Sequence, residues 1–364
     1  MNVCIIGEGL TALSLAKSLI NKKINVHYYH KNRNSNFSSN RTIGISKSNF
    51  EFFKDKIFQI SKNNYWKINR IEIYTDKIDT ENLLKFDNDK NDLFYIIKND
   101  ELLKSLKSNL IKSKFFKKII LKKDVNEESL NKKEYDLIIN CDGGNFLAKK
   151  YFTKKISKNF YNLAYTTILK HEKIENYTAT QIFTKQGPIA FLPISNIETS
   201  VVYSINIKNK KFDNSDVIDL INKNNPKYKI NKIAKLNSFK LSSSNLRSYY
   251  YKNILAFGDM LHRVHPLAGQ GFNMTIRDLR VLSQIIDGKI ELGIQLDSLI
   301  LDEFEKKTKD KNFVFSNAIG LIYEIFNFDK NIKNKNFSKT LKTIGKNKNF
   351  NNYFVKLADT GFNT

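Results

Sequence analysis

Glycine, proline, cysteine and arginine are all scarce in this chain of 364 residues, which has 14 glycines, four prolines, two cysteines and seven arginines. Cys4 and Cys141 fall in segments expected to be buried strands, and their number and separation imply no disulfide framework. His262 and His265 are the one close pair of histidines, but no cysteine or acidic cluster beside them completes a metal site. The sequence therefore disfavours a disulfide-stabilised scaffold and a metalloenzyme.

Long hydrophobic runs are missing too. No segment approaches the roughly 18 to 20 apolar residues that a membrane-spanning helix needs, and the chain enters an apolar strand at once, without a basic or cleavable leader. We therefore expect a cytoplasmic protein. Because 41% of the residues are hydrophobic and 12% aromatic, the chain is expected to fold into two domains, each with its own core.

Negative charge is in short supply, since 61 basic residues stand against 36 acidic ones and give a formal net charge of +25. Lysine supplies almost all of the excess, and lysine, asparagine and isoleucine share A/T-rich codons. Genome composition therefore explains much of this charge. The alternative is that the charge attracts the protein to the cytoplasmic face of an anionic membrane. Few arginines and an even spread of lysines disfavour nucleic acid as a partner.

The first motif lies at the N-terminus. An apolar strand over residues 2–6 leads into Gly7-Glu8-Gly9-Leu10-Thr11-Ala12 and then into a helix. In this context Gly7 permits the tight turn, Gly9 lets the backbone approach a pyrophosphate, and Ala12 keeps the helix close to the sheet. The pattern predicts a dinucleotide-binding fold.

One residue that such a fold usually carries is missing. The second strand, over residues 25–30, is expected to end in an acidic residue that binds a ribose. It reads Asn-Val-His-Tyr-Tyr-His instead. His30 or a nearby asparagine is the candidate for that role.

The most specific stretch runs from Gly258 to Asn273. A strand over residues 253–257 enters Gly258-Asp259, and after a loop containing Pro266 the sequence Gly-Gln-Gly-Phe-Asn (269–273) opens a helix. Backbone N–H groups and the positive end of a helix dipole are therefore expected to face an electron-rich ring or a phosphate. Asp259, at the carboxyl end of its strand, is placed to accept hydrogen bonds from hydroxyl groups.

Between these motifs the pattern is mostly that of strands. Residues 135–144 predict a buried strand that ends in Asp142-Gly143, and residues 178–183, 188–194 and 200–207 predict a β-meander. The meander carries three large aromatic residues that either line an apolar pocket or fill the core of the sheet: Phe183, Phe191 and Tyr203.

The chain after about residue 300 is helical by pattern. Its predicted apolar stripe is Phe313, Ala318, Leu321, Ile322 and Ile325. The lysine-rich tail over 327–364 has Phe337, Leu341 and Ile344 at helical spacing. This tail either lies on an anionic membrane or caps the nucleotide-binding domain.

The run from Gly258 to Asn273 closely resembles the signature of the flavin-dependent aromatic hydroxylases of ubiquinone biosynthesis, a branch of the class A flavoprotein monooxygenases. The resemblance implies an α/β fold, in which a Rossmann-like FAD-binding domain is interleaved with a mainly antiparallel β-sheet substrate domain and followed by a helical C-terminus. The implied FAD-binding domain comprises residues 1–64, 93–155 and 250–300, the substrate domain 65–92 and 156–249, and the helical region 301–364.

The resemblance also implies a cofactor site. Asp259 would hold the ribityl chain of FAD, Pro266 would lie beside the isoalloxazine, and the amides of 269–273 would face its pyrimidine edge. The full set of implied cofactor-binding residues is Gly7, Gly9, Ala12, Arg41, Asp142, Gly143, Gly258, Asp259, Pro266, Gly269, Gln270, Gly271 and Asn273. The alternative interpretation of Arg41 is an arginine on the surface without a role in cofactor binding. Phe146 and Lys149 replace a serine and an arginine of the family, so we infer no nicotinamide site from this segment.

By the same resemblance, the expected reaction is hydroxylation of an aromatic ring with O2, with NADH or NADPH as the electron donor and a polyprenylated phenol as the substrate. The flavin C4a-hydroperoxide would carry the chemistry beneath an apolar cover formed by the meander. No side chain is therefore assigned as catalytic, and His262, His265 and Pro266 lie nearest to the reaction. Peripheral contact with an anionic membrane or a quinone-synthesis complex stays open.

Three other functions compete with this interpretation. The first is another flavoprotein on the same scaffold, such as a prenyl-chain reductase or a different aromatic monooxygenase. The second is a flavin-binding or RNA-binding protein that depends on the lysines. The third is a non-catalytic flavin-binding partner of a quinone-synthesis complex, suggested by the missing acidic residue and by Phe146 and Lys149.

Overall fold

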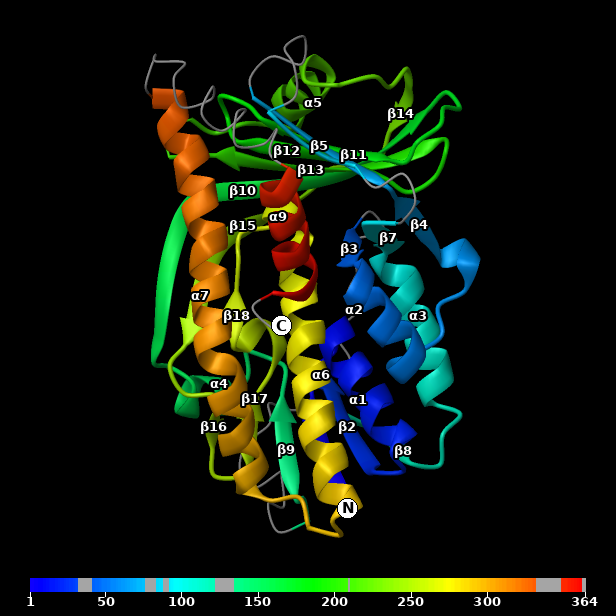
Figure 1. The fold of residues 1–364 in the computed structure, drawn as a ribbon, viewed down its shortest axis with the longest axis vertical. Helices are drawn as coiled ribbons and strands as arrows, with labels where there is room; N and C mark the ends of the chain where they lie inside the picture. The colour runs from blue at the N-terminus through cyan, green and yellow to red at the C-terminus, as the bar shows by residue number, and fades with distance from the viewer. Residues whose placement is uncertain are drawn as a thin grey trace.

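The computed structural model describes residues 1–31, 41–75, 83–87, 92–121, 134–208, 210–331 and 348–361. A parallel sheet with its helices occupies one end of the molecule and a broad antiparallel sheet covers the other, with a long helix running along both (Figure 1). The fold is the mixed α/β arrangement that the sequence predicts. Among the described residues, no helix has both the length and the apolar character needed to cross a membrane.

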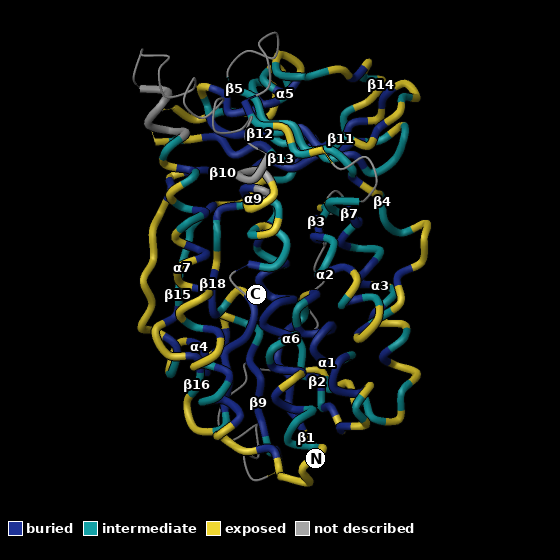
Figure 2. Tube along the Cα trace, viewed as in Figure 1, coloured by how far each residue is buried: buried dark blue, intermediate teal, exposed yellow. Residues whose placement is uncertain are grey.

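The first sheet is the nucleotide-binding type of sheet that the N-terminal motif predicts. Its strands follow the order β16-β17-β9-β1-β2-β8, and the last five are parallel to one another. Their bounds are β1 Asn2–Ile6, β2 Asn25–Lys31, β8 Phe116–Leu121, β9 Leu137–Asn140, β16 Tyr250–Tyr251 and β17 Ile254–Ala256. The helices α1 (Leu10–Asn21), α3 (Asn99–Leu110) and α6 (Gln270–Glu291) pack with it into one buried core, seen as dark blue in Figure 2. The strand β9 ends at Asn140, so Cys141 lies in the loop after the strand and not within it.

The second sheet is antiparallel over most of its width. Its order is β18-β15-β10-β13-β12-β11-β5-β6, and β14 pairs with β10. The bounds are β5 Arg70–Thr75, β6 Leu84–Asp87, β10 Lys155–His171, β11 Thr178–Phe183, β12 Pro188–Pro193, β13 Glu198–Asn206, β14 Ile230–Ile233, β15 Asn237–Leu246 and β18 His262–Arg263. Strands β11, β12 and β13 coincide with the predicted meander.

The two faces of this second sheet have different neighbours. The outer face packs against α5 (Asn214–Lys223), and its buried cluster includes Phe191 and Tyr203. Phe183 belongs instead to a cluster with Leu267 and Met274 on the opposite, inner face. Because successive residues of a strand point to opposite faces, a pocket-lining role for Phe191 and Tyr203 on the inner face is excluded, and both fill the core beneath α5.

A small third sheet lies between the other two. Its order is β3-β7-β4, with β3 Thr42–Ser46, β4 Tyr65–Ile68 and β7 Phe94–Lys98. The short helices α2 Lys47–Phe52, η1 Phe53–Ile57 and η2 Lys62–Asn64 connect β3 to β4. Within the segment 65–92, β4 therefore pairs with β7, while β5 and β6 join the antiparallel sheet. The division of the chain into a FAD-binding domain and a substrate domain remains a proposal. Its boundary falls within residues 65–92.

The helix α7 (Ser298–Asn331) follows a different stripe from the predicted one. Phe313 and Leu321 are exposed, whereas Phe304, Phe315 and Ile319 are buried. The buried face also includes the polar residues Thr308, Asn312 and Ser316. The predicted stripe was wrong at Phe313 and Leu321, whereas Ile322 packs against a buried cluster as predicted. A search for apolar residues passes over the polar side chains that share the buried face.

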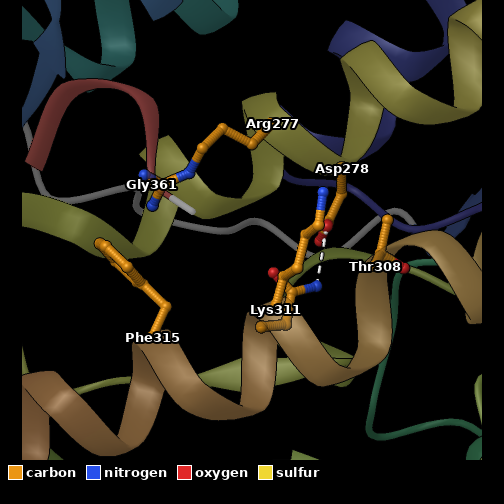
Figure 3. A pocket seen from close by; sticks show the side chains of 7 residues that line it. Arg277, Asp278, Thr308, Lys311, Phe315 and Gly361 are labelled. Atoms are coloured by element: carbon orange, nitrogen blue, oxygen red, sulfur yellow. Dashed lines mark hydrogen bonds between the residues drawn. The ribbon is translucent and has the colours of Figure 1, made fainter. Parts of the chain in front are cut away.

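The described part of the tail is α9 (Lys348–Thr360), which docks on the protein; Phe337, Leu341 and Ile344 lie outside the described residues. Asp359 accepts hydrogen bonds from the Ser48 amide and hydroxyl at 2.9 and 2.8 Å. At the end of α9, Gly361 lies against the guanidinium group of Arg277, which stacks over Phe315 at 4.2 Å (Figure 3). This segment of the tail is therefore a cap on α2 and α6.

Asn273 ties α6 to the third sheet. Its Oδ1 accepts hydrogen bonds from the Ser46 amide (2.9 Å) and Asn49 Nδ2 (3.1 Å), and its Nδ2 donates to the carbonyls of Gly44 (2.9 Å) and Gly269 (3.0 Å). The residue is fully buried, so each of these groups would otherwise lose a partner without gaining water.

Replacing Asn273 with alanine is expected to lower the free energy of unfolding by about 2 to 4 kcal/mol, because several buried donors and acceptors lose their partner. Urea denaturation of the cofactor-free protein measures this change. Asn317→Ala is the matched control, since Asn317 is exposed and its side chain donates to the Phe313 carbonyl within α7. This change should alter stability by less than about 0.5 kcal/mol. Equal losses in the two variants would contradict the role of Asn273.

Candidate functional site

The three sequence motifs meet at the carboxyl edge of the parallel sheet. Ile6 at the end of β1 pairs with Tyr29 on one side and with Asn140 on the other, and Asn140 pairs in turn with Ala256. The turns that follow these strands therefore lie side by side. In open α/β sheets, ligands bind at this edge of the sheet.

Close backbone approaches hold these turns together. Gly258 has a φ of +68°, and a Cβ built there would lie 2.5 Å from Thr11 Cγ2. Gly7 has a φ of +144°, and its Cβ would lie 3.1 Å from the Cβ of Cys141. Both positions need glycine for their conformation and for space. The motif at 258 thus packs directly on the first turn of α1.

The N-terminus of α1 is open. Gly9 precedes the helix, no side chain caps it, and no acidic residue lies in the first turn. A Cβ built at Gly9 would meet no atom within 4 Å. The free N–H groups and the positive end of the helix dipole therefore face a space that a phosphate group fits. Ala12 is completely buried against the sheet.

The two acidic residues of the site have different environments. Asp259 is exposed and makes no hydrogen bond or ion pair with the described part of the chain. Asp142 Oδ1 accepts a hydrogen bond from the Gly144 amide at 2.9 Å, so this carboxylate shapes its own turn. Gly143 in that turn approaches Met260, next to Asp259; a Cβ there would lie 3.6 Å from Met260 Cγ. Asp259 is the carboxylate that is free to bind a ligand hydroxyl.

The loop after Pro266 leads to the second open helix. Residues Leu267–Gly269 form η4, and Gly269 precedes α6 in the left-handed conformation with a φ of +62°. A Cβ at Gly269 would lie 3.8 Å from the Gly44 carbonyl oxygen, so the loop rests on β3. No side chain caps α6. The Asn273 side chain is fully engaged within the protein, and the buried Gln270 side chain accepts a hydrogen bond from Arg277 Nη2 at 3.5 Å. The backbone groups of 269–273 are therefore the candidates for contact with a ligand.

His262 belongs to a buried polar network under this loop. His262 Nε2 lies 2.5 Å from Asp278 Oδ2, and Asn312 Nδ2 donates to Asp278 Oδ1 at 2.8 Å. All three residues are buried. The network joins β18, α6 and α7, so the structure gives His262 an architectural position.

His265 connects the Pro266 loop to the antiparallel sheet. Its Nε2 lies 3.0 Å from Ser204 Oγ, and its ring stacks on Tyr323 with the ring centroids 4.2 Å apart. Asn162 Nδ2 donates to Tyr323 OH at 2.5 Å. Burial lowers the pKa of His265 to about 3. The imidazole is therefore neutral at physiological pH and serves as a fixed contact between the loop and β13.

Two further predicted positions lie at the edges of this region. Arg41 is exposed, and its guanidinium carbon lies 5.8 Å from the ring centroid of Phe239, on β15. His30 Nε2 is buried without a hydrogen-bond partner among the described residues. The Gly7 amide donates to the Tyr29 carbonyl at 3.0 Å, which brings Glu8 next to the end of β2. Sequence reasoning missed Glu8, whose only signal was its place between two motif glycines.

One cavity of about 20 Å³ lies away from this edge, between α6, α7 and Gly361 (Figure 3). Arg277 Nη1 is buried there without a hydrogen-bond partner within the described residues, and burial lowers the pKa of Arg277 to about 10. This space holds about one or two water molecules. It is too small for an aromatic substrate.

Comparison with known proteins agrees with this geometry. Residues 124–291 match the model of the FAD binding domain family. The ubiquinone biosynthesis monooxygenase COQ6 of Dictyostelium discoideum is 24% identical over 419 residues, covering 89% of this chain and 84% of that protein. The chain is therefore similar to FAD-dependent monooxygenases, and its similarity to a ubiquinone-biosynthesis monooxygenase extends over most of its length. The 3-demethoxyubiquinol 3-hydroxylase of Escherichia coli is 26% identical over 215 residues, covering 56% of this chain and 54% of that protein.

Two solved structures share the fold. The p-nitrophenol 4-monooxygenase PnpA of Pseudomonas putida aligns with a TM-score of 0.78 at 12% identity, covering 100% of this chain and 98% of that one. HpxO of Klebsiella pneumoniae, solved with FAD and uric acid, aligns with a TM-score of 0.70 at 12% identity, covering 99% and 96%. These two structures show the fold alone, which is the scaffold that the sequence predicts. The use of FAD by an enzyme of this kind rests on the match to the FAD binding domain and on the similarity to a monooxygenase.

The buried His265 predicts a specific pH dependence of stability. Its pKa is about 3 in the folded protein against 6.5 for an unperturbed histidine, so the unfolded chain binds more protons between these values. The contribution of His265 is therefore fully present above pH 6.5 and is lost as the pH falls toward 3. His265→Gln is expected to reduce the loss of unfolding free energy between pH 7 and pH 5 by about 2 kcal/mol. Urea denaturation at the two pH values measures this difference, and an unchanged loss would contradict a buried neutral imidazole.

Proposed function

We propose that this enzyme hydroxylates the aromatic ring of a polyprenylated phenol in ubiquinone biosynthesis. NADH or NADPH supplies two electrons, one atom of O2 enters the ring, and the other leaves as water: ArH, O2, NAD(P)H and H⁺ give ArOH, H2O and NAD(P)⁺. The single observation that carries the proposal is the convergence of Gly7–Gly9, Gly258–Asp259 and the Pro266 loop at one edge of the sheet.

The residues at this edge fit FAD. The open N-terminus of α1, with Gly9 facing empty space, suits the pyrophosphate. The unpartnered carboxylate of Asp259 suits the hydroxyls of the ribityl chain. Backbone amides around Gly269, at the uncapped start of α6, suit the electron-rich pyrimidine edge and stabilise negative charge there. When bound, FAD accepts hydride from NAD(P)H and activates O2 for transfer of one oxygen atom.

The substrate class rests on the relatives. Proteins named for ubiquinone biosynthesis match along most of the chain, which supports a phenolic ring with a prenyl chain. The net charge of +25 also supports peripheral contact with an anionic membrane or an acidic partner in a quinone-synthesis complex. The docked helix α9 gives no support to such a peripheral contact, because its end lies against Ser48 and Arg277.

The first test follows the visible spectrum of the FAD-loaded protein under anaerobic conditions. Flavin bleaching by NADH or NADPH should accelerate when a short-chain prenylphenol is added, and aerobic turnover should give a product with one additional oxygen atom. Asp259→Ala should lose FAD, because the ribityl hydroxyls lose their acceptor. Asp297→Ala, at an exposed carboxylate before α7, is the matched control and should retain FAD.

Two outcomes would contradict this proposal. A protein that binds FAD but is never reduced by either nicotinamide would favour the non-catalytic flavin-binding partner. Reduction without an oxygenated product, together with saturation of a prenyl chain, would favour a reductase on the same scaffold.

We also propose that Glu8 replaces the acidic residue missing from β2. The Gly7–Tyr29 hydrogen bond fixes the turn over the end of β2. Burial lowers the pKa of His30, and the negative charge of Glu8 opposes this change, so the two side chains lie within electrostatic range. A carboxylate here can accept hydrogen bonds from the adenosine ribose, with His30 Nε2 as a second group.

Glu8→Gln should weaken FAD binding about ten-fold, as expected for a hydrogen bond to a charged group, and should leave the affinity for FMN unchanged because FMN has no adenosine. Flavin fluorescence titrations measure both affinities. Glu291→Gln, at the exposed end of α6, is the control. Equal weakening of FAD and FMN would show that Glu8 acts on the turn as a whole and not on the ribose.

A further inference from the structure

Three residues form a partly exposed row across the inner face of the antiparallel sheet. Gln181 on β11 pairs with Ala190 on β12, which pairs with Val202 on β13. Paired residues of neighbouring strands lie on the same face, so these three side chains point together toward the flavin domain. All three are partly exposed in the middle of a sheet whose flanking positions are largely buried. We call Gln181, Ala190 and Val202 the inner row.

Along the strands, residues on both sides of the inner row contact the proposed flavin domain. On one side, two residues further along the strands, Ser204 lies against His265 and Phe183 packs with Leu267. On the other side, Thr42 Oγ1 donates to Ser200 Oγ at 2.8 Å, and Ala179 packs with Ile68 and Ile96. The domains therefore touch before and after the inner row.

The inner row lies between two elements of the proposed cofactor site. The contacts on one side involve His265 and Leu267, which flank Pro266. The contacts on the other side involve Thr42, the first residue of β3. These elements meet where a Cβ at Gly269 would lie 3.8 Å from the Gly44 carbonyl. The inner row thus faces the junction of η4 and β3, beside the edge that fits the flavin.

Gln181 is the one residue of the inner row that can form hydrogen bonds through its side chain. Its Nε2 donates to the Ile189 carbonyl at 3.1 Å, which fixes the amide group on the sheet. Its Oε1 has no hydrogen-bond partner among the described residues, and it accepts hydrogen bonds only. Ala190 and Val202 are small, apolar and partly exposed, so the accessible surface beside this single acceptor is apolar.

We propose that Gln181 orients the substrate ring, with its Oε1 accepting a hydrogen bond from the phenolic hydroxyl while the ring lies over Ala190 and Val202. Gln181 is then a specificity-determining residue that selects a ring with a free hydroxyl. Holding that hydroxyl also fixes which ring carbon faces the flavin. This inference rests on the proposed hydroxylase function and names the residue that sets its orientation.

The experiment compares a short-chain 2-prenylphenol with its O-methyl ether, which lacks the donor. Binding to the FAD-loaded protein is followed through the change in flavin absorbance, without turnover. The wild-type protein should bind the phenol roughly five-fold more tightly than the ether, the size expected for one neutral hydrogen bond. In Gln181→Met the two affinities should become equal, and more H2O2 should form per NAD(P)H consumed because the ring is no longer held.

Two variants serve as controls. Gln186→Met makes the same change in the turn between β11 and β12, outside the inner row, and should keep the wild-type ratio. Ala190→Leu fills the space beside Gln181 and should weaken both ligands together without changing FAD content. It therefore tests the position of the ring even if Gln181→Met fails to fold.

The outcomes separate this inference from the proposed function. A preference for the phenol that persists in Gln181→Met, or unchanged binding in Ala190→Leu, would overturn the inference while hydroxylation stands. Absence of FAD reduction, or of any oxygenated product from the wild-type protein, would overturn the proposed function itself.

Discussion

The close approach of Gly258 to Thr11 is the constraint on which the site depends. Two segments almost 250 positions apart must pass so near each other that one additional carbon atom would overlap Thr11 at 2.5 Å. The pairing of β1, β9 and β17 brings the turns to the same edge, but it does not by itself orient them. The glycine does, because it permits the left-handed turn that directs Asp259 outward while the backbone stays against α1. Because the chain has so few glycines, a glycine at this position indicates that the close approach is required.

Buried polar contacts then fix the loop that follows. His262 with Asp278, His265 with Ser204, and Asn273 with β3 each tie the segment around Pro266 to a different element. Buried polar groups contribute little net stability, but breaking one partner is costly. Such contacts therefore specify a geometry more than they strengthen the fold. The role proposed for this loop, to present backbone amides to the flavin, requires such specificity, since small displacements would misplace every amide at once.

The sequence predicted the parts of this structure that depend on local rules. The Gly7–Ala12 turn, the meander strands and the start of α6 follow from glycine positions, alternation and helix signals, and each lies where it was expected. The stripe on α7 failed because Asn312 and Thr308 are buried as hydrogen-bonding partners, which no hydrophobic pattern reveals. The partners of Asn273 and the neighbourhood of Glu8 were not predictable either, because both depend on which distant turn lies opposite. The pairing of β4 with β7 was not predictable for the same reason, since it is a property of the assembled fold.

The inner face of the antiparallel sheet carries polar side chains among the apolar residues that the resemblance implied. The large aromatic residues Phe191 and Tyr203 lie on the outer face beneath α5, while Ser200, Ser204 and Gln181 lie on the inner one. Alternation requires this division once the register is set, because residues that stabilise the core of the sheet cannot also face the flavin. The hydroxyl groups of Ser200 and Ser204 contact Thr42 and His265. Among the described residues, the surface that remains between them is small and apolar and carries one acceptor without a partner, Gln181 Oε1. A ring with a single hydroxyl matches that surface better than a uniformly apolar ligand, and this favours recognition of the phenol head over recognition of the prenyl chain.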